Sequence, residues 1–304
     1  MRIHHINCGT ECPIGGHLMD GSTPGLGPCT LTCHCLLIET NDGLVLVDTG
    51  FGLEDIRDPH RRLSDFFYYV NNIKLREQET AARQIERLGF KRDDVRHILL
   101  THLDFDHAGG ITDFPKAKVH LLAEEYRHAM YARTIKDVLR FRPQQWTKPS
   151  LWNKYEVGGE NWFGFECVRD LEGLPPEILI VPLVGHTFGH SGIAVDTGDG
   201  WLLHAGDAYF YRDEMRVENP YCTPGLRAYQ TAMEVDRRSR LWNQDRLRAL
   251  KRDHGDDVRI ICAHDHKEFE AARSMSEFLS DGTELTPGLL RRKPQPADQG
   301  LSLH

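Results

Sequence analysis

The sequence of 304 residues lacks any apolar run approaching the roughly 18–20 residues that a membrane-spanning helix needs. It also lacks an excess of basic residues, because 37 Lys and Arg stand against 45 Asp and Glu, a formal net charge of −8. Faces that bind nucleic acid neutralise phosphates with Lys and Arg, so this balance argues against a broad face of that kind. We therefore expect neither a nucleic-acid partner nor a membrane partner.

The N-terminal residues lack the apolar core of a secretory signal, which favours a cytoplasmic location and reduced thiols. Five of the eight cysteines fall within the first 35 residues. The pairs Cys8–Cys12 and Cys29–Cys33 would allow a thiolate zinc site, but their spacing is looser than that of a standard Cys-x-x-Cys pair. The simpler interpretation is that the cysteines are small buried apolar side chains.

A hydrophobic content of 40% with 27% charged residues is typical of a globular protein. No repeat period and no change in composition marks a linker, so we expect one domain over 1–285 and a C-terminal tail over 286–304. Helical spacing predicts helices over 77–88, 124–140 and 226–252. Short apolar runs predict strands over 1–8, 31–40, 44–48, 95–100, 118–122, 178–184, 193–197, 201–204 and 258–262.

Histidine is abundant, with 17 residues, and four of the expected strands end in His or Asp. Strand ends are where folds that mix helices and sheets gather their sites. The residues at these ends are His102, Asp104, Asp106 and His107, then His186, Asp207 and His264. Imidazole and carboxylate together suit Zn, Fe or Mn. Because only a tight loop turns four neighbouring ligands inward, we expect Gly109 and Gly110 to supply backbone freedom there.

The motifs at these strand ends resemble those of metallo-β-lactamase superfamily hydrolases. They are Val47-Asp48-Thr49-Gly50, the segment 102–107, the segment 185–191, Ala205-Gly206-Asp207 and Cys262-Ala263-His264, in the family's order over residues 30–266. The segments CHCLLIETNDGLVLVDTGFG and THLDFDHAGG are most similar to those of dinuclear acyl-homoserine lactonases. The resemblance implies an α+β fold, a four-layer αβ/βα sandwich with a pair of metal ions at one edge.

The resemblance also implies which residues bind the metals. The first ion would be held by His102, Asp104 and His186, the second by Asp106, His107 and His264, and both by Asp207. Asp106 would also orient the attacking hydroxide. His190 would support the ligands without binding metal, and Asp48 would brace the metal loop through hydrogen bonds.

Asp104 departs from the family pattern His-x-His-x-Asp-His, which has histidine at this place. A carboxylate also occurs here, as glutamate, in the iron-binding flavodiiron branch. With histidine, two divalent ions outweigh two carboxylates and a bridging hydroxide by one charge, and a third carboxylate cancels that excess. A neutral centre should polarise a carbonyl less strongly. We expect two divalent ions, Zn first and Fe or Mn as alternatives because of Asp104.

The resulting hypothesis is a metallo-hydrolase, lactonase-like or esterase-like, in which a metal-bound hydroxide attacks a lactone, ester or thioester carbonyl. A small neutral or apolar substrate suits the acidic site, and a homodimer is a candidate assembly. One alternative is a flavodiiron-like non-haem iron redox protein, which would need a partner protein to carry the flavin. The other is a catalytically weak metal-binding sensor.

The resembling lactonases place a tyrosine three residues after the bridging aspartate, as a donor to the substrate. Here position 210 is phenylalanine, flanked by Tyr209 and Tyr211, and we take Tyr209 as the catalytic candidate. The aromatic stretches 66–69 and 146–165 are candidates for a pocket wall, although such rings also serve as core.

Overall fold

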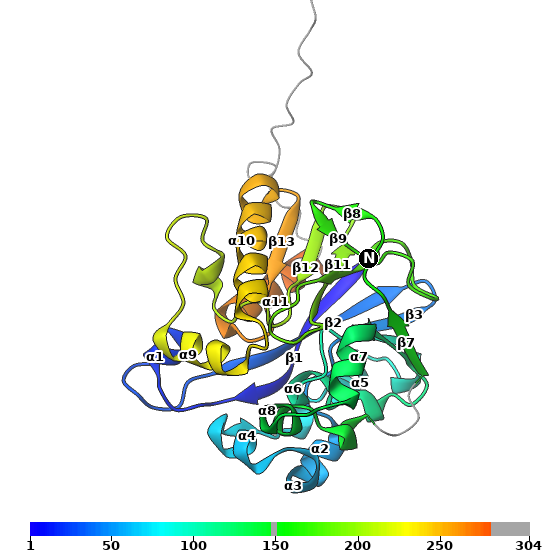
Figure 1. Cartoon of the computed structure of the whole chain (residues 1–304). Helices are drawn as coiled ribbons and strands as arrows, with labels where there is room; N and C mark the ends of the chain where they lie inside the picture. Colours follow the sequence, from blue (N-terminus) through cyan, green and yellow to red (C-terminus); the bar gives the residue numbers. More distant parts are fainter. Residues whose placement is uncertain (147–150, 281–304) are drawn as a thin grey trace, which may run out of the picture.

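The computed structural model describes residues 1–146 and 151–280, with side-chain burial up to residue 276. Two β-sheets face each other within this part of the chain (Figure 1). The larger sheet has the strand order β4-β1-β2-β3-β5-β6-β7. Its strands are β1 Arg2–Glu11, β2 Leu31–Thr40, β3 Gly43–Val47, β4 Ile73–Lys74, β5 Val95–Leu99, β6 Lys118–Leu122 and β7 Leu151–Tyr155.

The smaller sheet has the order β10-β11-β12-β13, and a separate hairpin pairs β8 with β9. These strands are β8 Asn161–Trp162, β9 Phe165–Glu166, β10 Ile178–Pro182, β11 Ser191–Asp196, β12 Trp201–His204 and β13 Val258–Ile261. The neighbours β3, β5 and β6 run parallel, as do β12 and β13, so the loops after these strands gather at shared edges.

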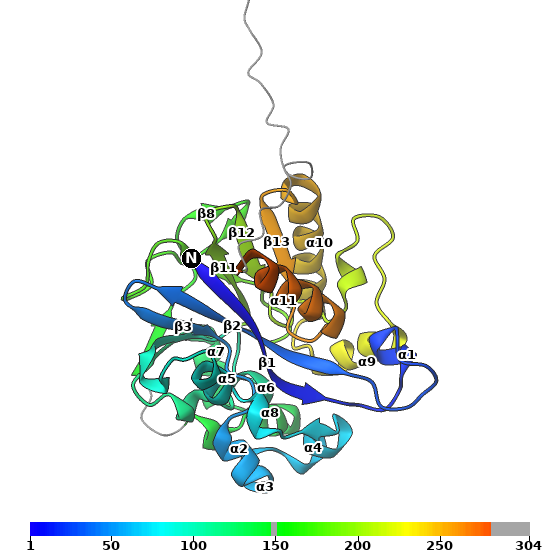
Figure 2. The same cartoon turned by 180° about the vertical axis from the view of Figure 1, so that it is seen from behind.

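Helices cover the outer faces of both sheets (Figure 2). The α-helices are α1 His17–Asp20, α2 Leu53–Arg57, α3 Pro59–Arg62, α4 Asp65–Val70, α5 Ala81–Arg87, α6 Phe105–Ala108, α7 Ala123–Met130, α8 Ile135–Arg140, α9 Pro224–Met233, α10 Arg237–His254 and α11 His266–Ser280. The 3₁₀ turns are η1 Glu77–Glu79, η2 Arg92–Asp94, η3 Ile111–Asp113, η4 Pro143–Gln145 and η5 Arg212–Met215. No helix in the described ranges is long and apolar enough to cross a membrane.

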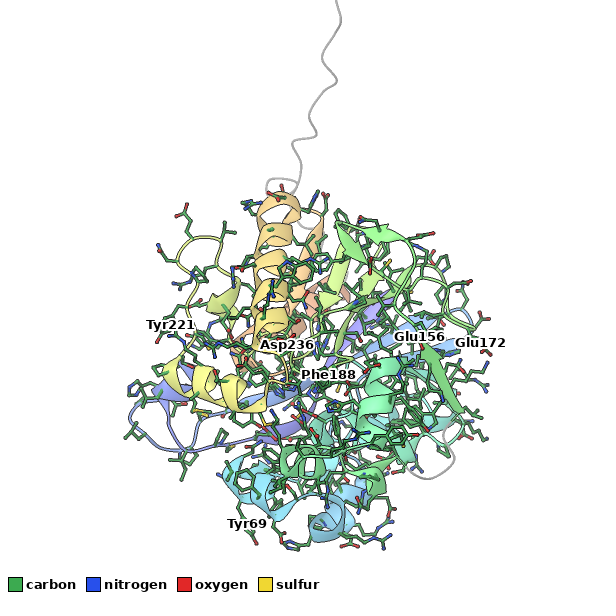
Figure 3. The ribbon with its side chains drawn as sticks, in the orientation of Figure 1. Tyr69, Glu156, Glu172, Phe188, Tyr221 and Asp236 are labelled. Carbon is green, nitrogen blue, oxygen red and sulfur yellow. The ribbon has the colours of Figure 1, made fainter. Side chains whose placement is uncertain are left out.

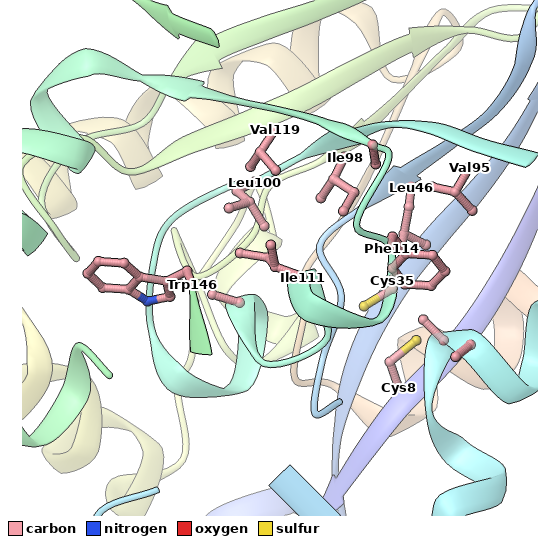
Figure 4. Close-up of a cluster of buried hydrophobic side chains, with 14 of the residues drawn as sticks. Cys8, Cys35, Leu46, Val95, Ile98, Leu100, Ile111, Phe114, Val119 and Trp146 are labelled. Carbon is pink, nitrogen blue, oxygen red and sulfur yellow. The ribbon is translucent and has the colours of Figure 1, made fainter. Parts of the chain in front are cut away.

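Three buried clusters divide the molecule into layers. Apolar side chains from both sheets, such as Ile38 and Ile193, fill the space between the sheets. A second cluster joins the larger sheet to α5 and α7 (Figure 4), and a third joins the smaller sheet to α10. This helix–sheet–sheet–helix order confirms the expected four-layer α+β sandwich. The single-domain assignment over 1–285 stays a prediction, and the tail 286–304 lies outside the described residues.

All three expected helices differ in extent from those in the structure. Two of them are each divided into two helices, because side chains cap the backbone inside the expected segment. The segment expected over 124–140 is two helices, and α8 begins where the Thr134 hydroxyl accepts from the Asp137 N–H. The segment expected over 226–252 is also two. Asp236 caps α10, and the Gly185 carbonyl accepts from the N–H groups of residues 235 and 236 between the helices. The segment 77–88 begins as a 3₁₀ turn before Thr80 caps α5.

Candidate metal centre

The segment after β5 carries four of the predicted ligands. It is not the irregular loop that we expected, since residues 105–108 form the one-turn helix α6. Gly109 and Gly110 have ordinary negative φ values, so backbone freedom is not their role. A side chain at Gly109 would place its Cβ 2.1 Å from Oδ2 of Asp55, so close packing of the backbone is what requires glycine there.

Asp48 braces this segment, as predicted. It follows β3 at φ 54, a conformation that Asp and Asn tolerate better than most residues. Its Oδ1 accepts from the Thr101 N–H, and its Oδ2 accepts from the Thr101 hydroxyl and from Nδ1 of His107, each at 2.8 Å. One buried carboxylate thus fixes both the start of the ligand segment and the orientation of a ligand ring.

Hydrogen bonds at Nδ1 set the tautomers of three ligand imidazoles. His107 donates from Nδ1 to Asp48, and His264 donates from Nδ1 to the Thr32 carbonyl at 2.8 Å. His102 donates from Nδ1 to the Thr101 hydroxyl at 2.9 Å, because that hydroxyl already donates to Asp48. In its neutral form, each ring therefore has its proton on Nδ1 and directs the lone pair of Nε2 toward the centre of the site.

The ligand atoms converge in two sets, and Asp207 belongs to both. Its Oδ1 lies 3.3 Å from Nε2 of His107 and 3.1 Å from Nε2 of His264. Its Oδ2 lies 3.4 Å from Nε2 of His186 and 3.8 Å from Nε2 of His102. Ligands that sit about 2.0–2.2 Å from one tetrahedral ion are separated by distances of this size. Asp106 completes the set of His107 and His264, its Oδ2 lying 3.7 and 3.5 Å from their Nε2 atoms.

Buried atoms without partners show that these residues fit metal ions. Nε2 of His102, Nε2 of His107 and Oδ1 of Asp207 have no hydrogen-bond partner within the described chain, although all three are buried. Buried polar atoms are nearly always paired, so a ligand is the expected partner. The donor set of imidazole and carboxylate suits Zn, Fe or Mn.

The charges in this cluster favour protonated imidazoles at the positions where metal ions would bind. Burial alone would lower the pKa of His264, but the Asp207 carboxylate raises it to about 9. Burial would likewise raise the pKa of Asp207, yet the imidazoles of His264 and His107 hold it well below its usual range. A metal ion entering this set must therefore displace a proton, and its affinity should fall as the pH falls.

Arg140 is a residue of this centre that the sequence analysis missed. It is fully buried, and its Nε and Nη2 donate to the two oxygens of Asp104 at 2.6 and 2.5 Å. Burial alone would raise the pKa of Asp104, but Arg140 holds it well below the usual range. Oδ2 of Asp104 also lies 3.0 Å from Nε2 of His186 and 3.4 Å from Nε2 of His102. Metal ligation by Asp104 stays a prediction, and it would require Asp104 to give up its contact with Arg140.

Two further buried side chains hold the loops together. His190 donates from Nδ1 to the Leu183 carbonyl, and its Nε2 accepts from the Asp207 N–H at 2.9 Å, which confirms a supporting role. Glu125, which the sequence analysis missed, accepts from the Leu103 N–H with one oxygen and from the Thr187 hydroxyl and a main-chain N–H with the other. It therefore clips the loop after β5 to the loop after β10.

A small cavity of about 10 Å³ opens onto the centre, enough for about one water molecule. Its polar wall includes Asp106, Asp207 and a third carboxyl, Glu11, which the sequence analysis also missed. Burial and the nearby Asp106 raise the pKa of Glu11 to about 8, and the Asn71 amide donates to both of its oxygens. The apolar wall consists of Leu31, Phe105, Phe210, Tyr229 and Met233.

The two aromatic stretches do not line this cavity. Phe67 stacks on the cavity residue Phe105 from behind, with ring centroids 5.0 Å apart, while Tyr69 is exposed at the surface (Figure 3). Trp146 and Trp162 are buried in two different core clusters. Residues 147–150 of the second stretch lie outside the described residues.

Tyr209 does not reach the cavity either, so its position gives the predicted contact with substrate no support. The side chain is fully buried, and its hydroxyl donates to the Glu268 carboxyl at 3.0–3.1 Å. Tyr209 packs in the cluster beneath α10, because the chain after Asp207 turns this ring toward the smaller sheet.

We expect Tyr209→Phe to change kcat/KM by less than about threefold, because the lost hydroxyl contacts Glu268 and no cavity residue. Steady-state kinetics on the best ester or lactone substrate measure this. Tyr229→Phe is the comparison, since Tyr229 lines the cavity. A fall of 100-fold or more in Tyr209→Phe would restore Tyr209 as a catalytic candidate.

Glu268 should make the stability of the protein depend on pH. Burial raises its pKa from 4.5 to about 7, so the folded protein holds this proton to higher pH than the unfolded chain does. The free energy of unfolding should therefore fall as the pH rises from about 4.5 to 7. We expect Glu268→Gln to gain roughly 1–3 kcal/mol relative to the wild type over this range. Urea unfolding at pH 5, 6, 7 and 8 tests this, and a constant difference would contradict it.

Comparisons with known proteins agree with this geometry. Residues 30–264 match the model of the metallo-beta-lactamase superfamily. A probable metallo-hydrolase of Mycobacterium tuberculosis is 42% identical over 275 residues, covering 90% of this chain and 83% of the relative. An N-acyl homoserine lactonase of Bacillus cereus is 28% identical over 218 residues, covering 69% and 78%.

Solved structures show the same fold at lower sequence identity. An N-acyl homoserine lactone hydrolase with the product N-hexanoyl-L-homoserine at its catalytic metal centre matches with a TM-score of 0.65 and 21% identity, covering 89% of this chain and 95% of that one. A dizinc quorum-quenching lactonase matches with a TM-score of 0.57 and 14% identity, covering 86% of each chain. At these identities the likeness establishes the architecture alone.

Proposed function

We propose that this chain, which belongs to the metallo-beta-lactamase superfamily, hydrolyses a lactone, ester or thioester carbonyl of a small neutral or apolar substrate. It is a hydrolase of that superfamily and is related to lactonases. One observation carries the proposal: Asp207 faces both buried ligand sets, with Oδ1 near His107 and His264 and with Oδ2 near His186 and His102 as well as His264. When bound in such a pair, two divalent ions activate a water molecule and polarise a carbonyl.

We assign separate roles in metal binding and in proton transfer to the residues of this centre. We assign one ion to His102, His186 and Asp207, and the other to Asp106, His107, His264 and Asp207. Zinc is the first expectation, with iron or manganese as alternatives. Asp106 lines the cavity, so its carboxylate is placed to orient a water molecule and to take its proton.

The cavity wall supports the choice of substrate. Asp104, Asp106 and Asp207 place carboxyl groups around the same small space, which disfavours an anionic substrate. The apolar side chains around them suit an acyl chain or ring. Relatives named as N-acyl homoserine lactonases add support for a lactone.

A panel of lactones and aryl esters, assayed with Zn, Mn or Fe after removal of metal by a chelator, tests the proposal. We expect turnover that disappears with the metal and returns when it is added back. Asp106→Asn should lose at least about 100-fold in kcat/KM, whereas Asp199→Asn, an exposed residue of the turn before β12, should not change it. Absence of turnover with every metal would refute the hydrolase assignment.

The same preparations address the two alternatives. A diferric centre absorbs visible light in air and a zinc pair does not, so metal content with an aerobic spectrum distinguishes a flavodiiron-like redox protein. Tight metal binding without turnover would favour a sensor. The cytoplasmic location and a homodimer stay predictions, which fractionation and sedimentation would test.

A further inference from the structure

Arg140, the last residue of α8, uses every N–H of its buried guanidinium inside the protein. Nε and Nη2 donate to Asp104, and Nη1 donates to the main-chain oxygens of Met233 and His186 at 2.8 and 3.3 Å. The second proton of Nη2 faces Nε2 of His186 at 2.7 Å. Since a guanidinium has five N–H groups, none is left to bind a substrate.

The contact between Arg140 and His186 decides the state of that imidazole. A guanidinium has no lone pair, so in this 2.7 Å contact Arg140 donates and Nε2 of His186 accepts. The same Nε2 lies 3.0 Å from Oδ2 of Asp104, to which it would donate only in the other tautomer, where its proton would face the Arg140 N–H. With Arg140 donating, the proton of His186 lies on Nδ1, which is buried without a partner in the described chain. Nε2 is also the atom that faces Oδ2 of Asp207 at 3.4 Å. Arg140 and a metal ion would therefore compete for one electron pair.

No guanidinium competes for the ligand atoms of the other set within the described residues. His107 and His264 use Nδ1 for Asp48 and for the Thr32 carbonyl, which leaves Nε2 of both rings facing Oδ1 of Asp207. Within the described residues, Asp106 forms its close charge pairs with these two imidazoles and with no Arg or Lys. The set of His102 and His186 thus differs from the other set in two ways. The positive charge of Arg140 lies beside it, and the lone pair of Nε2 of His186 is already engaged.

We propose that Arg140 is a positioning residue that makes the two metal sites unequal by capping Nε2 of His186. This inference rests on the proposed function, since it concerns the same metal pair. The set of Asp106, His107 and His264 takes up an ion first and tightly. The set of His102 and His186 takes up an ion only when Arg140 releases His186, and Asp104 stays the guanidinium's counter-ion.

Zinc titration of the chelator-stripped full chain tests the inequality without an activity assay. We expect two dissociation constants that differ by at least about tenfold, a size of effect known for groups that contact metal ligands. Competition against a chromophoric chelator measures both constants. Crystals grown with one equivalent of Zn²⁺ identify the first site, and the anomalous peak should lie at the set of Asp106, His107 and His264.

Two substitutions should change the zinc affinity of the weaker set, His102 and His186, in opposite directions. Arg140→Gln removes the competing cation, so the zinc affinity of the set of His102 and His186 should rise by about tenfold and the two constants should converge. Asp104→Asn leaves that cation without its counter-ion, so the zinc affinity of the same set should fall. Arg240→Gln is the matched control, because it breaks another buried ion pair, with Glu234 at 2.6 Å, outside the ligand sets.

The possible outcomes distinguish a failure of this inference from a failure of the proposed function. If the wild type binds none of Zn, Mn and Fe, the metal centre and the proposed function both fail. If it binds two ions with equal affinity, only the inference fails. A fall in the zinc affinity of the set of His102 and His186 in Arg140→Gln would show that Arg140 supports this set and would overturn the proposal. If that variant does not fold by circular dichroism, the anomalous peak and Asp104→Asn decide, and a peak at His186 overturns it.

Discussion

Asp207→Asn is expected to lose one bound metal ion and at least about 100-fold in kcat/KM. The carboxylate faces both ligand sets, and its oxygens lie 3.1–3.4 Å from three of the imidazoles and 3.8 Å from the fourth. Asparagine keeps one oxygen and turns an amide N–H₂ toward the other set. It also removes the one negative charge that both ions would share.

Metal analysis after dialysis and steady-state kinetics measure these two losses. The fold should survive, because the Asp207 N–H that donates to Nε2 of His190 belongs to the main chain and is unchanged. Asp199→Asn makes the same chemical change at an exposed turn and should behave as the wild type. Retention of two ions with activity within a fewfold of the wild type would show that Asp207 does not bridge.

Asp48→Asn should weaken metal binding by about 10- to 100-fold and destabilise the folded protein by about 1–3 kcal/mol. Asparagine tolerates the φ of 54 at this position, so the substitution changes hydrogen bonding without straining the main chain. The carboxylate accepts three hydrogen bonds, from the main chain and hydroxyl of Thr101 and from His107. An amide N–H₂ must face at least one of these donors.

Either orientation of that amide is unfavourable. An N–H₂ toward His107 pushes its proton to Nε2, the atom that faces Oδ1 of Asp207. An N–H₂ toward the Thr101 N–H leaves a buried donor unsatisfied. Thermal unfolding with and without zinc, and zinc competition with a chelator, measure both effects. Asp42→Asn, at an exposed turn before β3, is the control, and unchanged zinc affinity in Asp48→Asn would limit Asp48 to a structural role.

The residues that converge at the candidate metal centre could be predicted from the sequence because each lies at the end of a short apolar strand. Strand ends are local features, and a strand of the larger sheet or the smaller sheet brings its end to the same edge wherever the helices lie. The bracing role of Asp48 followed from the same motifs. The ends of the helices were harder to predict, since a capping residue such as Asp236 divides an otherwise helical pattern.

Arg140, Glu11 and Glu125 carried no local signal. Arg140 lies 36 residues after Asp104 and reads as an ordinary charged residue in a short helix. It enters the site because α8 packs against the loop after β5, a contact that no residue spacing encodes. Tyr209 shows the converse, because a tyrosine near the right position in the sequence faces Glu268 instead of the cavity.

The sequence by itself determined which ligand types the chain supplies, their order, and therefore the family and the four-layer fold. The tertiary structure alone decided that Asp207 faces both sets, that the Thr32 carbonyl 232 residues away orients His264, and that Arg140 pairs with Asp104. The reason is physical. Periodicity and turn chemistry act over a few residues, whereas the direction of a buried side chain follows from the packing of elements distant in the chain.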